Sequence, residues 1–135
     1  MRVVSKAEAI QLLKDVVAER GEDYVYGTAI PSQCFYSVDG EPSCGVGLAI
    51  FKLDPNIFEQ VVALEQTLDH SWGADDFSVS ADGDDEYGYP NRDEKEVESI
   101  PLRFEDDAAR VMGVFQSNQD AGTTYALALA RALEV

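Results

Sequence analysis

Residues 34–47 join an apolar, strand-like run to a turn and then to the start of an apolar helix. No other stretch constrains the fold as strongly. Asp39-Gly40 is a turn pair, and Pro42 suits the first turn of a helix. Gly45 and Gly47 each lower helix propensity by about 1 kcal/mol relative to alanine, so we expect another segment of backbone to pack closely against them. We interpret this run as the corner on which a single domain packs.

Apolar spacing and capping residues predict five helices. Ser5 and Glu8 form a capping box ahead of a helix over about residues 6–20. Asp54-Pro55 supplies a cap and a first residue for a helix that runs to about residue 68. The other three are expected over residues 44–53, from the acidic turn at 105–107 to the break at 120–122, and from Thr123 or Thr124 to Leu133.

Short aromatic and β-branched runs predict a small sheet. We expect residues 24–28 and 34–38 to pair as antiparallel strands, and the alternation of Ile100, Leu102 and Phe104 to add a third. A chain of 135 residues can bury an adequate core as one domain. The predicted fold is therefore α+β, with about five helices packed on a small antiparallel sheet, in a single domain over residues 1–135.

Negative charge is concentrated in the second half of the chain. The formal net charge is −16, and residues 69–107 hold 14 acidic and three basic side chains, a balance of −11. Such a charge argues against direct binding to nucleic acid or to an anionic membrane. Residues 69–99 have little periodicity, so we expect either a marginal hairpin or a mobile excursion there.

Aromatic side chains stand among these acidic residues, a mixture typical of interaction surfaces. A carboxylate array that imitates DNA is a narrower form of the same hypothesis, and a solvated loop without a partner is the plain alternative. The predicted binding residues are Trp72, Asp75, Asp76, Asp84, Asp85, Glu86, Tyr87 and Tyr89.

No motif for catalysis, metal binding or cofactor binding is complete. Cys34 and Cys44 are best interpreted as reduced structural thiols, with a disulfide or a metal site as alternatives. Zinc would need two further ligands, and His70 is the only histidine. An EF-hand loop beginning at Asp82 would need glycine where Tyr87 stands. The glycine pair of the corner lacks the Lys-Ser/Thr of a phosphate loop. We therefore predict no metal, no cofactor and no catalytic residues.

Four short motifs occur along the chain: Tyr24-Val-Tyr26, Cys34-Phe-Tyr36, Pro42-Ser-Cys44 with Val46-Gly47, and Gln116-x-x-Gln119-Asp120-x-Gly122-x-Thr124-Tyr125. Together they resemble small acidic proteins encoded by phages and prophages of actinobacteria. The resemblance implies a bacterial host cell during infection or lysogeny, and it implies no particular site residues. With no signal peptide and no long apolar run, the expected location is the cytoplasm.

Three functions are compatible with these observations. The first is a non-enzymatic binding or inhibitory protein directed at a host protein, which could be basic or nucleic-acid-binding. The second is a binder of a small ligand or nucleotide derivative, or a small enzyme, with a pocket near the corner at residues 34–47. The third is a self-associating module in which the apolar helix at the C-terminus forms a homodimer.

Overall fold

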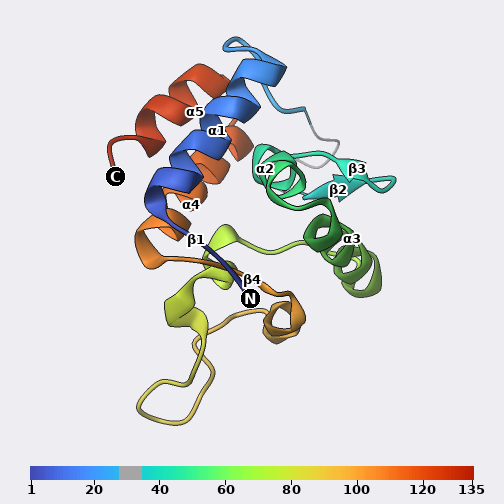
Figure 1. Ribbon diagram of the computed structural model, residues 1–135, viewed down its shortest axis with the longest axis vertical. Coiled ribbons are helices and arrows are strands. Elements are labelled where there is room, and N and C mark those ends of the chain that lie inside the picture. The colour runs from blue at the N-terminus through green and yellow to red at the C-terminus, as the bar shows by residue number, and fades with distance from the viewer. Residues whose placement is uncertain (28–34) are drawn as a thin grey trace.

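The structure is a computed structural model that describes residues 1–27 and 35–135 (Figure 1). The expected five helices are confirmed, and they pack with two small sheets in an α+β arrangement. The helices are α1 (Lys6–Arg20), α2 (Gly45–Leu53), α3 (Pro55–Leu68), α4 (Asp106–Asp120) and α5 (Tyr125–Ala132). The strands are β1 (Arg2–Val4), β2 (Ser37–Val38), β3 (Glu41–Pro42) and β4 (Leu102–Phe104), and three 3₁₀ helices are η1 (Ala74–Phe77), η2 (Val79–Ala81) and η3 (Lys95–Ser99).

The helices begin where local capping chemistry places them. The Ser5 hydroxyl accepts a hydrogen bond from the Glu8 N–H, and the Glu8 carboxylate accepts one from the Ser5 N–H, which completes the predicted capping box. Asp54 caps α3 ahead of its proline, and Thr124 caps α5. Because each signal is local in sequence, the helix starts could be predicted without knowledge of the tertiary structure.

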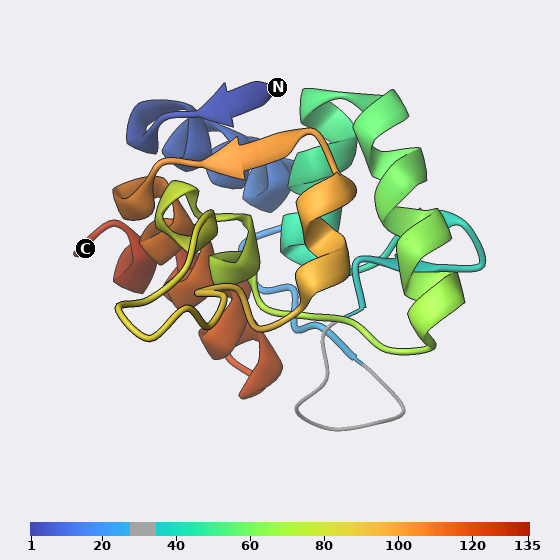
Figure 2. The same cartoon turned by 90° about the horizontal axis from the view of Figure 1, so that it is seen from below.

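The prediction of one antiparallel sheet is wrong. The strand expected near residues 100–104 exists as β4, but it pairs in parallel with the N-terminal strand β1, with Val3 opposite Arg103. Figure 2 shows these two strands side by side at one edge of the molecule. The pairing joins residues about one hundred positions apart. Strand β1 has only the three residues Arg2–Val4 before α1, too few to show the alternation that indicated β4.

The second sheet is a short antiparallel hairpin around the predicted Asp39-Gly40 turn, whose two residues both have positive φ. It pairs β2 with β3, so the expected pairing of residues 24–28 with 34–38 is not formed by the residues described, and residues 28 and 34 lie outside them. Tyr24 and Tyr26 instead serve as packing residues: the Tyr24 ring contacts Tyr125 edge-on, and the Tyr26 hydroxyl lies 2.6 Å from the Ser43 Oγ.

Helix α4 is central to the core: α1, α5, α2 and η1 all contact it. Its buried face carries Val111, Met112 and Phe115. Helix α5 is buried against α4 through Tyr125, Ala128 and Ala132. The expected close backbone contact at the corner is also present, because a Cβ at Gly47 would lie only 2.1 Å from the Tyr36 carbonyl oxygen.

Residues 69–99 form the three 3₁₀ helices, which contribute Phe77, Ala81 and Val97 to the buried side chains, and a closed loop over residues 83–90 that stays exposed at the surface. Phe77, Val79 and Ala81, which could have formed one arm of a hairpin, belong to η1 and η2. Ser78 forms an isolated parallel bridge with Phe104, so this segment extends the β1–β4 edge by one residue pair.

Candidate functional site

The eight predicted binding residues divide into two groups in the structure. Trp72 and Asp76 are buried, with 8% and 5% of their surface exposed. The other six lie on the surface: Asp75, Asp84, Asp85, Glu86, Tyr87 and Tyr89. Five of these belong to one loop, residues 83–90, which we call the acidic loop.

Trp72 contributes to an aromatic cluster in the core. Its ring lies 5.3 Å from the Tyr36 ring and 6.1 Å from the Phe77 ring, and Phe77 in turn contacts Phe104. The Tyr36 hydroxyl donates to the Trp72 carbonyl oxygen at 2.8 Å. Trp72 therefore fixes the start of the acidic segment to the core and does not offer its ring to a partner.

The acidic loop is closed by its own hydrogen bonds. The Asp85 carboxylate accepts from the backbone N–H groups of Tyr87 at 2.8 Å and Tyr89 at 3.0 Å. The Asp85 N–H donates to the Tyr89 carbonyl at 2.7 Å, and Asp84 and Pro90 form an antiparallel bridge. Gly88 adopts a φ of +83° within this loop, a conformation that glycine reaches without strain. The sequence therefore encodes one preferred loop conformation.

This conformation places two tyrosines in solvent. Tyr87 is 78% exposed and Tyr89 is 70% exposed, which makes them, with Met1, the most exposed large apolar side chains of the described residues. Three carboxylates, on Asp84, Asp85 and Glu86, precede them in the chain. Figure 1 shows the loop projecting from the body of the molecule, in yellow. The loop thus presents aromatic and acidic groups together on a convex element.

Two buried arginines fasten the base of the loop. Asp82, which precedes the loop, accepts from Arg92 Nη2 at 2.8 Å and from Arg103 Nε at 2.9 and 3.0 Å. These hydrogen bonds, with Arg103 contributing most, lower the pKa of Asp82. Arg92 also donates to the Asp76 carbonyl, and Arg103 to the Ile100 carbonyl. Arg92 and Arg103 are 5% and 3% exposed, so the guanidinium groups lie in the protein interior, while the Asp82 side chain that they share is 44% exposed at the surface.

Sequence reasoning did not identify this clamp. The available signal was that Arg92 and Arg103 are two of only three basic residues in a strongly acidic segment. A buried guanidinium requires acceptors, and Asp82 with the nearby carbonyls supplies them. A second contact holds the same region, since His70 Nε2 on the C-terminal side of α3 lies 2.7 Å from Glu94 Oε2. This hydrogen bond raises the pKa of His70.

Asp75, Asp76 and Asp93 bring their carboxylate oxygens within 4.8 Å of one another. Burial, followed by the negative charge of Asp75, raises the pKa of Asp76 to about 6. The Asp93 N–H donates to Asp76 Oδ1 at 3.1 Å. Carboxylate oxygens are ligands of Ca²⁺ and Mg²⁺, but Asp76 already serves as a backbone acceptor here. Its role is to hold residue 93 against η1.

In the described part of the corner, residues 35–47, several polar groups make hydrogen bonds within the protein. The Cys44 Sγ accepts from the Gly47 N–H at 3.3 Å and so caps α2. The Gln119 side chain accepts from the Gly45 N–H at 2.7 Å and from the Tyr125 hydroxyl at 2.5 Å. Several residues that carry the family resemblance therefore meet at this corner as packing partners. Cys34 and its predicted relation to Cys44 lie outside the described residues.

Glu65 is a buried carboxylate that sequence reasoning also missed. It is 5% exposed on α3 and accepts from the Tyr36 N–H at 2.7 Å, the Ser37 N–H at 2.9 Å and the Ser37 hydroxyl at 2.6 Å. Burial raises the pKa of Glu65, while these hydrogen bonds act in the opposite direction. The sequence of α3 does not show that Glu65 is a hydrogen-bond acceptor, because its donors, Tyr36 and Ser37, come from a distant segment.

Across the parts of the chain that the structure describes, no helix combines the length and the apolar character needed to cross a membrane. Comparison with known proteins found no matching family, no similar curated protein and no similar solved structure.

Proposed function

We propose that the protein is a non-enzymatic binding protein that engages a basic protein partner through the acidic loop. The observation that carries this proposal is the exposure of Tyr87 and Tyr89 on a loop whose conformation is held by Asp85. Tyrosine is enriched among the residues that dominate binding energy at interfaces. A loop already held in one conformation loses less entropy on binding than a flexible one.

Charge selects the kind of partner. Asp84, Asp85 and Glu86 stand beside the tyrosines, and the net charge of the chain is −16. Complementary charge steers association and suppresses partners of like charge. The partner surface should therefore be basic and concave enough to receive a projecting loop. The resemblance to phage and prophage proteins directs the search to proteins of an actinobacterial host.

The experiment compares the protein with a loop variant as bait in a host lysate, followed by affinity measurement on the purified partner. Replacing both Tyr87 and Tyr89 by serine should weaken binding at least 30-fold, since a single dominant interface residue typically contributes about 2 kcal/mol or more. Affinity should also fall as salt is raised. Binding that is unchanged in the double variant would exclude the acidic loop as the interface.

A matched pair tests whether the conformation of the loop matters. Asp84→Ala and Asp85→Ala each remove one carboxylate from the same loop, but only Asp85 accepts hydrogen bonds from the two tyrosine N–H groups. Asp84→Ala should weaken binding a few-fold through lost charge, at the level expected of an exposed ion pair. Asp85→Ala should weaken it about tenfold more, because the loop must then be ordered on binding. Equal losses of affinity in the two variants would show that Asp85 contributes to binding through its charge alone.

A further inference from the structure

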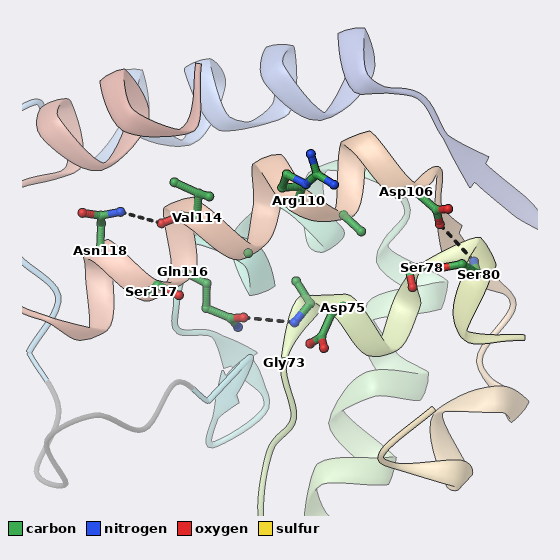
Figure 3. Close-up of a pocket in the computed structure, with 13 residues that line it drawn as sticks. Gly73, Asp75, Ser78, Ser80, Asp106, Arg110, Val114, Gln116, Ser117 and Asn118 are labelled. Atoms are coloured by element: carbon green, nitrogen blue, oxygen red, sulfur yellow. Dashed lines mark hydrogen bonds between the residues drawn. The ribbon is translucent and has the colours of Figure 1, made fainter. Parts of the chain in front are cut away.

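A hollow runs along one side of α4, apart from the exposed tip of the acidic loop (Figure 3). Its volume is about 680 Å³, and it lies between α4 and the segment that contains η1 and η2. Its lining on α4 begins at Asp106 and reaches Asn118, and its opposite wall runs from Gly73 to Ser80. We call this hollow the α4 groove.

The groove is long and shallow. Asp106 and Asn118 are twelve positions apart on one helix, which corresponds to about 18 Å at 1.5 Å per residue. Small residues, Ala109 and Gly113, line its middle, and a Cβ added at Gly113 would meet no atom within 4 Å. Compact ligands usually occupy enclosed pockets that cover most of their surface. A trough of this length is better matched to an extended chain, of which about five residues would span it.

The walls offer groups that main-chain atoms could use. Ser78 is only 8% exposed and lines the groove, and its hydroxyl is both a hydrogen-bond donor and an acceptor. Ser117 and Arg110 are exposed on the α4 side. Hydroxyl and guanidinium donors suit peptide carbonyls, and the absence of a side chain at Gly113 lets another backbone approach closely.

The charged side chains favour a basic occupant. Asp75 and Asp106 line the groove, and Arg110 is the only basic residue among the described residues that line it. The Asp75 carboxylate also lies beside those of Asp76 and Asp93, so a cation near it would relieve their mutual repulsion. We propose that the α4 groove binds an extended polypeptide segment that carries a lysine or arginine. This site goes beyond the acidic loop, and either one could exist without the other.

A random heptapeptide library, panned against the purified protein, provides the probe. Enriched peptides should contain a basic residue, and one of them, labelled with fluorescein, gives affinity by fluorescence anisotropy. Gly113→Trp would fill the groove at a position with free space and should weaken binding at least tenfold. Glu59→Trp, on an exposed position of α3, is the matched control and should leave affinity unchanged. Asp75→Lys tests the charge without filling the groove and should also weaken binding at least tenfold.

Each outcome decides the proposal. Loss of binding in Gly113→Trp and Asp75→Lys, with retention in Glu59→Trp and in the Tyr87/Tyr89 double variant, would support it. Peptides that bind equally well to Gly113→Trp and Asp75→Lys but lose affinity when Tyr87 and Tyr89 are replaced would overturn it and leave the acidic loop as the interface. Enrichment of acidic or neutral peptides, or of none, would also overturn it.

Discussion

Replacing Gly47 by alanine should destabilise the protein, although alanine is the better helix former. Gly47 lies in the first turn of α2, and its missing side chain faces the backbone of Tyr36. The new Cβ would lie 2.1 Å from the Tyr36 carbonyl oxygen and 2.8 Å from the Tyr36 Cα and carbonyl carbon. Such contacts cannot persist, so one of the two segments would have to move by roughly 1 Å, since non-bonded carbon atoms are in favourable contact only near 3.5–4 Å.

Tyr36 has little freedom to move. Its N–H donates to Glu65 at 2.7 Å, its carbonyl accepts from the Ser43 N–H at 3.0 Å, and its hydroxyl donates to the Trp72 carbonyl at 2.8 Å. Overpacking of this kind typically costs about 1–3 kcal/mol, and the gain in helix propensity offsets about 1 kcal/mol at most. Because the clash is with backbone held on three sides, we expect a net loss of about 2 kcal/mol.

Gly113→Ala is the matched control. It makes the same chemical change inside a helix, but its Cβ would meet no atom within 4 Å. Alanine there should raise the free energy of unfolding by about 0.5–1 kcal/mol. The two substitutions should therefore change stability in opposite directions.

Urea denaturation followed by the fluorescence of Trp72, the only tryptophan, measures both changes. With m-values of about 1–3 kcal/mol/M for small proteins, the midpoint of Gly47→Ala should fall by roughly 1 M, and that of Gly113→Ala should rise slightly. A Gly47→Ala protein as stable as the wild type would refute the close packing of α2 against Tyr36.

Three further perturbations have defined outcomes. Glu65→Ala leaves the buried Tyr36 N–H and the part-buried Ser37 N–H without their acceptor and should lower the free energy of unfolding by about 2–4 kcal/mol, measured by thermal denaturation. Glu65→Gln keeps an acceptor oxygen and should cost less; equal losses would contradict the assigned hydrogen bonds. The pKa of Asp76 is raised to about 6 in the folded protein, so the folded state binds more protons than the unfolded state between about pH 4 and 6. The free energy of unfolding should therefore fall as pH rises through that range, by on the order of 2 kcal/mol. Asp76→Asn should lack this part of the decrease in urea titrations at pH 4 and 7, and parallel pH profiles would disprove it. Asp82→Ala removes the acceptor that two buried arginines share. Because the Asp82 side chain is itself 44% exposed, solvent can replace part of the lost interaction, and the cost should be about 1 kcal/mol. Amide hydrogen exchange over residues 83–91 should be faster than in the wild-type protein while exchange over α1 is unchanged; unchanged exchange in the loop would show that the clamp does not hold it.

The exposure of the loop residues could be predicted from the sequence, whereas their role in binding stays a prediction. The composition of residues 84–89 is sufficient to indicate an exposed acidic loop with aromatic groups, because so many charges cannot be buried without partners. The assignment of Trp72 to the same surface did not match the structure. A single tryptophan among polar residues gives no periodicity, so only its contacts with Tyr36 and Phe77 reveal that it is part of the core.

The sequence by itself determined the features that depend on neighbours along the chain. The capping box at Ser5, the Asp54-Pro55 start of α3 and the Asp39-Gly40 turn each satisfy backbone groups within a few residues. The close packing at Gly47 could also be predicted, because a glycine destabilises an apolar helix and is expected there only where another segment of backbone packs closely. In these cases the physical cause and its effect lie in the same short segment.

Only the tertiary structure decided how distant segments meet. The parallel pairing of β1 with β4, the clamp on Asp82 and the three donors to Glu65 all join residues that are well separated in sequence. Their hydrogen-bond partners are set by the packing of the helices, and no local pattern encodes that packing. The acidic loop combines both levels, since Asp85 sets its conformation locally while the buried arginines attach it to the core.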